Sequence, residues 1–373
     1  MKAIPKIIQP LRYLCGRSGL RVDVSSVRFV HSTTTKAAVA HPVNLHGPPP
    51  KPPTPAPGFA ERAEQRKIQS NPTSSDSIKL AQGIGEAKPS PLKRRFWKDV
   101  HVKEVEDGYQ VLLDTRAVRT PMKKPLHIPR SKPHLAHAIA LEWDLLESAQ
   151  QALKNHRIPL TSLTARAQDI SEQDSRGVTT IRDEICRTVL RYFDTDTLLS
   201  WAPASNVHEP PELSTGGTTG RPETLRDLQI RTAQPIIAFL VNQVWPGVEI
   251  RPTLEEDSIV PVPQPQETKD VVRGWIAGLG PYELAGLERG VLASKSLLVA
   301  VRLVVEWSEN FRHLQPRDEP RQFGIEKAAE ASSLEVTWQT GRWGEVEDTH
   351  DVDREDLRRQ LGSVVVLVSG ETR

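Results

Sequence analysis

The feature that most constrains the fold of this chain is a change in the spacing of its apolar residues near residue 131. Between residues 100 and 113, apolar and polar residues alternate on both sides of Asp107-Gly108. This pattern predicts a β-hairpin, and Leu126-His127-Ile128 predicts a further short strand. After residue 131, apolar residues follow the period of a helix, at Leu135, Ile139, Trp143 and Leu146. The predicted fold class is α+β, with a small N-terminal antiparallel β domain followed by a larger, mainly α-helical domain.

The same helical spacing recurs along the rest of the chain. It predicts helices near residues 178–199, 223–244, 267–278, 281–309, 318–340 and 350–361. The final apolar run, Val364–Val368, predicts a strand. Apolar helices with few charges, above all Leu297–Val305, are typical of a protein that binds other proteins.

Tryptophan and proline mark the limits of the folded part. All eight tryptophans lie between Trp97 and Trp343, which indicates a folded region of about residues 94–370. Ten prolines lie between residues 37 and 90, and such a segment lacks the apolar residues needed for a core. We therefore expect a leader at 1–36, a Pro-rich disordered linker at 37–93, a small β domain at 94–130, and a helical domain at 131–370 with a loop insertion at 205–222.

The leader predicts a mitochondrial address. Residues 1–36 hold seven Lys and Arg but one acid, Asp23, interleaved with apolar residues and followed by a Ser/Thr cluster, which is typical of a transit peptide. The remainder carries 42 basic against 46 acidic residues. A nucleic-acid-binding protein normally keeps a basic face in its folded part, so no nucleic-acid partner is expected.

Cysteine content and hydropathy add two expectations. Beyond the leader the single cysteine is Cys186, which cannot form an internal disulfide and fits a reducing compartment. The most apolar stretch, Val291–Val305, is interrupted by Lys295 and Arg302, so no membrane insertion is expected.

The sequence offers no recognisable reaction machinery. It lacks the phosphate-binding loop, the dinucleotide fingerprint, HExxH, GxSxG and paired CxxC motifs, so we expect no cofactor, no metal and no catalytic residue. His134 and His137 have a spacing that can serve a metal, but two ligands are too few and a solvated helix face is favoured. Asp194 and Asp196 resemble a metal-binding pair, although capping of helix ends explains both.

Glu288 is the most informative candidate residue. Helical spacing places it beside Leu284 and Leu292, and a carboxylate in an apolar stripe must either reach water or meet a partner. Pairing with Arg289 or Lys295 along the same helix is possible, but the spacings are poor. Pattern alone leaves a surface role and a functional role equally open. Gly286 and Gly290, four residues apart, favour close approach of another backbone.

The chain resembles a family of mitochondrial assembly chaperones that bind the α subunit of the F(1) sector of ATP synthase. The resemblance extends over nearly all of residues 94–370. It is carried by an ordered set of short blocks: Arg95-Phe96-Trp97-Lys98-Asp99-Val100, Leu113-Asp114-Thr115-Arg116, Arg119-Thr120-Pro121, Ala140-Leu141-Glu142-Trp143-Asp144, Pro159-Leu160-Thr161, Asp194-Thr195-Asp196, Gly286-Leu287-Glu288, Lys295-Ser296 and Trp343-Gly344-Glu345-Val346-Glu347-Asp348-Thr349-His350-Asp351.

The resemblance implies a β domain followed by a helical domain, and a matrix chaperone rather than an enzyme. It implies that the chain, a monomer when free, binds unassembled α subunit and prevents its aggregation until the β subunit arrives. The family's functional glutamate corresponds to Glu288, and we expect partner binding by Glu288, Leu284, Leu292 and Lys295. Trp97 and Trp143 also match, but core packing is their expected role.

Two other functions remain open at this stage. One is a matrix enzyme with an unrecognised metal site around His134, His137, Asp194 and Asp196. The other is a peripheral inner-membrane scaffold that uses the helix at 291–305.

Overall fold

The computed structural model describes residues 93–203, 224–254, 260–315 and 323–371. The chain divides into two units, Met1–Glu86 and Ala87–Arg373, and every described residue belongs to the second unit. The predicted transit peptide at 1–36, the predicted linker up to residue 92 and the predicted insertion at 205–222 lie outside the described residues.

An antiparallel sheet begins the described part and confirms the predicted hairpin. Strands β1 (Val100–Val105) and β2 (Gly108–Leu113) pair from Val105↔Gly108 to Val100↔Leu113. On its other side, β2 pairs with the short strands β3 (Arg116–Ala117) and β4 (Ile128–Pro129). Glycine is required at position 108, because a Cβ there would lie 2.1 Å from the carbonyl oxygen of Ile128.

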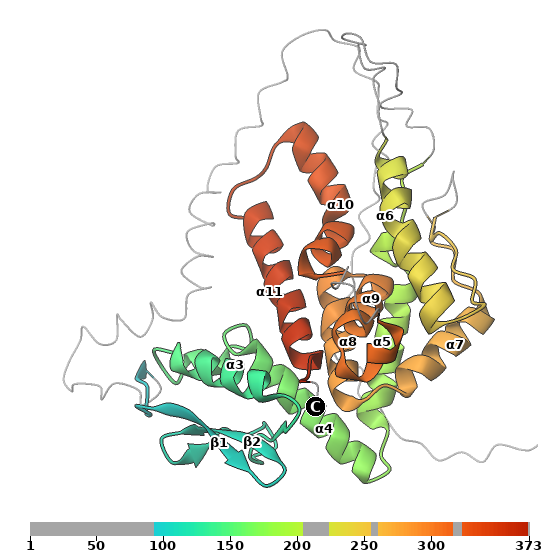
Figure 1. Ribbon diagram of the computed structural model, residues 1–373. Coiled ribbons are helices and arrows are strands. Elements are labelled where there is room, and N and C mark those ends of the chain that lie inside the picture. The colour runs from blue at the N-terminus through green and yellow to red at the C-terminus, as the bar shows by residue number, and fades with distance from the viewer. Residues whose placement is uncertain (1–92, 204–223, 255–259, 316–322, 372–373) are drawn as a thin grey trace, which may run out of the picture. The chain divides into compact units, whose positions relative to one another are not determined.

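Helix α3 (Pro133–Asp144) covers this sheet (Figure 1). The Trp97 side chain is buried beneath it and meets Trp143 edge to face, with 5.4 Å between ring centroids. The Trp143 indole N–H donates a hydrogen bond to the Thr161 hydroxyl at 3.1 Å. Both tryptophans therefore pack in the core, as predicted. The apolar residues that complete this part of the core are Val111, Leu113, Val118, Leu126, Ile128, Leu135 and Ile139.

The remaining helices form the larger part of the fold, and with the sheet they confirm the predicted α+β class. They are α4 (Pro159–Ser175), α5 (Thr180–Asp194), α6 (Leu225–Phe239, extended by a π-turn at Leu240–Val244), α7 (Gln266–Ala277), α8 (Pro281–Ser294), α9 (Leu297–Trp307), α10 (Ile325–Trp343) and α11 (His350–Val368). Short 3-10 turns lie at Gln151–Leu153, Thr197–Leu199 and Glu309–Leu314.

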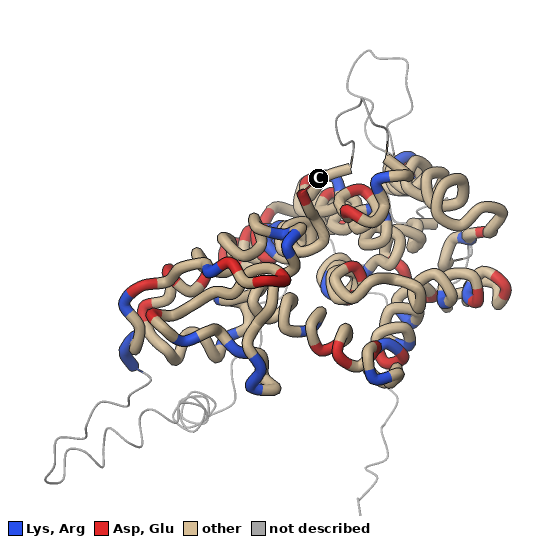
Figure 2. The backbone as a smooth tube through the Cα atoms, turned by 60° about the horizontal axis from the view of Figure 1, so that its bottom comes forward, with Lys and Arg blue, Asp and Glu red and all other residues tan. Residues whose placement is uncertain are grey.

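Helix α9 is the centre of the helical part. Every residue from Leu297 to Glu306 is buried, and α9 contacts α5, α6, α8, α10 and α11. Figure 2 marks the charged positions along the chain, and within α9 only Arg302 and Glu306 carry charge. The apolar pattern that favoured a protein-binding protein does not make α9 itself a binding surface, because its apolar residues are used by the protein's own core. For the same reason it is not available to a membrane while the fold is intact.

The single helix predicted at 281–309 is two helices. Lys295 adopts a left-handed conformation (φ 58°) that ends α8, and the Ser296 hydroxyl accepts a hydrogen bond from the Val299 N–H to begin α9. Apolar spacing runs through this corner unchanged, which is why periodicity missed it.

The strand predicted at Val364–Val368 is wrong, since these residues form the last turns of α11. This end of α11 packs on α8, where a Cβ at Gly286 would lie 2.8 Å from Val368 Cγ1. Gly290 similarly allows α8 to approach Ala300 of α9, 3.1 Å from a Cβ placed there. The predicted close approach at these glycines is therefore made by the protein's own helices.

Candidate functional site

Helix α8 and its C-terminal end carry the predicted partner-binding residues, but these residues differ in their exposure to solvent. Leu284 has no exposed surface, so it supports the helix from the core and cannot contact a partner in the folded protein. The Glu288 side chain is 20% exposed, Leu292 is partly buried, and Lys295 is exposed at the C-terminal end of the helix. The structure thus separates the predicted set into one core residue and three surface residues.

Glu288 pairs with Arg166 of the neighbouring helix α4. Arg166 Nε donates to Glu288 Oε2 at 3.0 Å and Nη2 donates to Oε1 at 2.9 Å, a bidentate arrangement. The Arg166 side chain is 31% exposed, so water reaches both partners. The alternative partners Arg289 and Lys295 are not used, because α4 packs along α8 and supplies a better-placed cation.

Negative charge exceeds positive charge around this pair. Burial on its own lowers the pKa of the Arg166 guanidinium, but the hydrogen bonds and charge of Glu288, with Glu184 and Asp169 adding, leave that pKa raised. Burial, and then the charge of Glu172, raise the pKa of Asp169. Lys124 lies near Asp169 and, with Arg176, pairs with Glu172. The carboxylates around Arg166 still outnumber these cations, so a further cation arriving from outside would be attracted to the site.

Lys295 is already occupied in closing the end of α8. Its Nζ donates to the carbonyl oxygen of Leu292 at 2.6 Å and lies 5.7 Å from the centre of the Tyr192 ring. A cation is favourable at a helix C-terminus, where the last carbonyl groups have no partner within the helix. Lys295 therefore combines an exposed charge with a structural contact.

Of the two aspartates, Asp196 caps a helix and Asp194 forms an ion pair with Lys269. Asp196 is fully buried and accepts hydrogen bonds from the N–H groups of Leu198 and Leu298, at 3.0 and 3.1 Å. Burial raises its pKa to about 6, against the opposing effect of these bonds and that of Ser296. Asp194 pairs with Lys269 at 2.7 Å. The capping interpretation is therefore confirmed for Asp196.

The histidine pair lies apart from these aspartates. His134 Nε2 lies 3.1 Å from the carbonyl oxygen of Val366 in α11, and His137 is exposed on α3. Among the residues that the structure describes, no three His, Cys, Asp or Glu side chains come together as metal ligands would. Within the same residues, no helix combines the length and apolar character needed to cross a bilayer.

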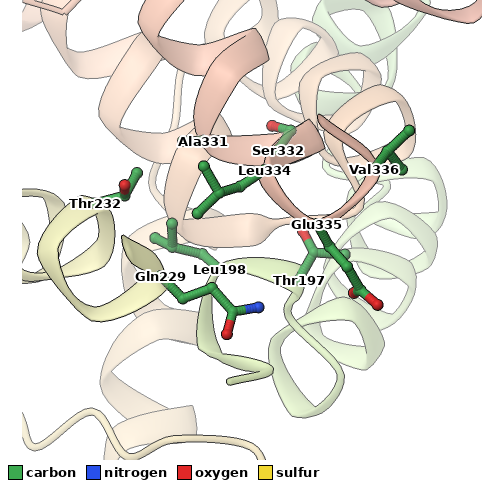
Figure 3. A pocket seen from close by; sticks show the side chains of 9 residues that line it. All are labelled: Thr197, Leu198, Gln229, Thr232, Ala331, Ser332, Leu334, Glu335 and Val336. Carbon is green, nitrogen blue, oxygen red and sulfur yellow. The ribbon is translucent and has the colours of Figure 1, made fainter. Parts of the chain in front are cut away.

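Two hollows lie between α6 and α10, and neither includes Glu288. The smaller, of about 150 Å³, lies between α6, α10 and the turn at Thr197–Leu199 (Figure 3). Its Gln229 amide is held by the N–H of Ala202 and the carbonyl oxygen of Ser200. The larger, of about 390 Å³, includes Arg302, which pairs with Glu306 at 2.6 Å. The residues that line these hollows include no cysteine or histidine.

Comparison with known proteins decides the family. The family model described as ATP12 chaperone protein matches residues 94–241. The chain is 31% identical to the mitochondrial atp12 protein of Schizosaccharomyces pombe, over 75% of this chain and 83% of the relative. It is 33% identical to the mitochondrial ATP12 protein of Saccharomyces cerevisiae, over 74% of this chain and 84% of that relative. The chain belongs to the ATP12 chaperone family.

Solved structures agree with the ATP12 fold. The crystal structure of Atp12 from Paracoccus denitrificans matches with a TM-score of 0.51 and 23% identity, over 74% of this chain and 98% of that chain. This likeness concerns the fold; the family resemblance drawn from the sequence blocks is confirmed by the two yeast relatives.

Arg166 is the site residue that sequence reasoning missed in this ATP12 chain. No helix was predicted at residues 159–175, because small and hydroxyl residues make up much of the buried face of α4. The signal was nevertheless present in the helical spacing of Leu160, Leu163, Ala167 and Ile170, all of which are buried. A helix predicted from this spacing places Arg166 on its exposed face. The spacing does not predict that this face lies opposite Glu288.

Proposed function

We propose that this chain is an assembly chaperone of the mitochondrial matrix that binds unassembled α subunit of the ATP synthase F(1) sector. It acts by binding rather than by catalysis and keeps the α subunit soluble until the β subunit replaces it. Membership of the ATP12 family carries the proposal. The basic, acid-poor leader at residues 1–36 supports the mitochondrial address.

The Arg166–Glu288 pair supplies the contact in this proposal. A partly exposed ion pair contributes about 1 kcal/mol or less to stability, so a client can replace it at little cost. Glu288 then pairs with a cationic side chain of the α subunit, with Leu292 and Lys295 beside it. The carboxylate in this way takes the place of a charge that the β subunit later provides.

Suppression of aggregation tests the function directly. Unfolded α subunit is diluted into buffer with and without the chain, and light scattering and size exclusion are followed together, with β subunit as the control client. We expect a soluble one-to-one complex with α subunit alone, formed by a chain that is monomeric when free. Aggregation of α subunit at the same rate with and without the chain would refute the proposal.

A further inference from the structure

The joined ends of α10 and α11 form a second surface, distinct from the Arg166–Glu288 site. We define the distal hairpin as residues 337–356, which comprise the end of α10, the connection and the start of α11. Every buried residue of α10 precedes residue 332 and every buried residue of α11 follows residue 360, so the distal hairpin has no buried residue. In Figure 1 the joined ends of the two helices lie away from α8 and α9.

The distal hairpin exposes apolar side chains that its own fold does not use. Trp343 is 79% exposed, and Val346 and Val352 are each more than half exposed. Nearby, Trp338 lies under the guanidinium of Arg342, which is 4.7 Å from its ring. Tryptophan contributes more binding energy at protein interfaces than most residues do, so a surface tryptophan at the end of a projecting hairpin is a candidate anchor.

The connection holds these side chains in a defined place. His350 Nδ1 accepts a hydrogen bond from the Val346 N–H at 2.9 Å, and the Thr340 carbonyl accepts one from the Gly344 N–H at 2.8 Å. Gly344 has a φ of 89°, which a residue with a side chain rarely adopts. The apolar residues are therefore presented by an ordered turn.

The distal hairpin is strongly acidic. It contains seven Asp and Glu against two Arg, a formal net charge of −5 with His350 neutral. Arg354 is engaged by Glu345. Among the described residues, Glu347, Asp348, Asp351 and Asp353 form no salt bridge. Asp351 and Asp353 lie in the first turn of α11, where a negative charge is favourable because of the helix dipole. Glu347 and Asp348 precede the helix, so the helix dipole does not explain their presence.

A shallow groove of about 120 Å³ runs between the two helices of this region. It includes Leu357 and Thr340 along its walls and Asp353 among its polar groups. An aliphatic stem that ends in a cation matches an apolar wall beside a carboxylate, and lysine and arginine have that form. Arg354 also lines the groove but is paired with Glu345, so Asp353 remains to meet a cation, and the groove favours the same partner charge as the hairpin as a whole.

From these observations we propose that the distal hairpin docks a basic amphipathic segment of the client protein. Trp343 and Val346 contact its apolar face, and Glu347, Asp348 and Asp353 face its Lys and Arg side chains. An anionic membrane or a nucleic acid would be repelled by a surface of this charge, and so would the same surface of a second copy of this chain. The inference rests on the proposed chaperone function, to which it adds a second contact.

Equilibrium titration of the full chain tests the docking surface without the α subunit. The probe is a helical peptide of Leu and Lys, with the same peptide carrying Glu in place of Lys and an anionic vesicle as comparisons. We expect the basic peptide to bind and the acidic peptide and vesicle not to bind. Glu347→Lys/Asp348→Lys and Trp343→Ala should each weaken binding about tenfold, and Trp343→Phe should restore part of it.

Matched controls keep the test specific. Glu104→Lys/Glu106→Lys makes the same charge change on the exposed β1 hairpin. Leu153→Ala removes an apolar side chain elsewhere that is 72% exposed, close to the 79% of Trp343. Both controls should bind the peptide as the wild type does. Equal binding by the distal-hairpin variants, or binding to the acidic peptide or the vesicle through Trp343, overturns the inference.

The same variants titrated with α subunit separate the two proposals. Loss of affinity in the distal-hairpin variants, with wild-type binding retained, supports the second contact. Wild-type binding of α subunit with no effect of these variants overturns the second contact and leaves the chaperone function standing. Failure of the wild type to bind α subunit refutes the chaperone function, and the peptide titration then decides the docking surface by itself.

Discussion

At the scale of single residues, substitutions at the Arg166–Glu288 pair should affect client binding far more than the stability of the fold. Glu288→Gln should cost about 1 kcal/mol or less in the free energy of unfolding, because water reaches both side chains. Glu288→Lys places two cations together and should abolish protection of the α subunit. Urea unfolding and light scattering measure the two effects, and α-subunit protection by Glu288→Lys at the wild-type level would contradict the role of this residue.

A charge swap at the same pair provides the matched control. Arg166→Glu combined with Glu288→Arg restores an ion pair of reversed polarity between α4 and α8. Stability should return in part, since the pair itself is re-formed but the new carboxylate at position 166 lies near Glu184 and Asp169. Client binding should not return, because the cationic client would then meet an arginine at position 288.

At the scale of helices, one carboxylate links the end of α3 to the start of α4. Glu142 accepts hydrogen bonds from the N–H groups of Leu160 and Thr161, at 2.6 and 2.9 Å. Burial outweighs these bonds and raises the pKa of Glu142 from 4.5 to about 7. Because the folded-state pKa is the higher one, the protonated form favours folding, and this contribution is complete below pH 4.5 and is lost as the pH rises through 7.

Glu142→Gln should remove that pH dependence, because glutamine resembles the protonated acid and does not titrate. Relative to this variant, the wild type should lose up to about 3 kcal/mol of unfolding free energy as the pH rises through that range. Urea unfolding at a series of pH values measures the difference. A difference that stays constant with pH would show that the pKa of Glu142 is the same in the folded and unfolded states, so that burial does not raise it.

Helix packing at α8 gives a second prediction at this scale. Gly286→Val should destabilise the protein by about 1–3 kcal/mol, because even its Cβ would lie within 2.8 Å of Val368. Gly274→Ala in α7 is the control, since nothing lies within 4 Å of a Cβ there and alanine favours a helix by up to about 1 kcal/mol. The urea concentration at the midpoint of unfolding should therefore be lower than that of the wild type for Gly286→Val and higher for Gly274→Ala.

The sequence predicted those helices and strands that are determined by residues close together in the chain. Asp107-Gly108 gave the β1–β2 hairpin, and apolar spacing gave α3 and α5 to within a few residues. The apolar run Val364–Val368 carried no period, because that end of α11 is buried on several faces, and so it was mistaken for a strand. The Arg166–Glu288 contact joins residues 122 positions apart, and only the packing of α4 on α8 brings them together.

At the scale of the described part of the molecule, Lys132 ties the beginning of α3 to the end of α11. Its buried Nζ donates to the carbonyl oxygens of Val368 and Ser369, at 3.1 and 2.8 Å, and pairs with Glu309 at 2.8 Å. The C-terminal end also returns to this point through the Glu371 N–H, which donates to the Ser131 carbonyl at 2.8 Å. The helix that covers the sheet is therefore fastened to the last helix of the chain.

Lys132→Met should cost about 1–3 kcal/mol of unfolding free energy, because it removes a buried cation from two carbonyl groups and from Glu309, which is 21% exposed and keeps its hydrogen bond from Ser131. We expect the wild type to unfold in one transition, since the sheet and the helices share this contact and one core. In Lys132→Met the unfolding transition should broaden or divide, because the part of the fold around Trp97 would unfold at a different urea concentration from the part around Trp245. Tryptophan fluorescence and far-ultraviolet circular dichroism during urea unfolding measure this. Two separate transitions already present in the wild type would instead mean that the sheet and the helices fold as independent domains.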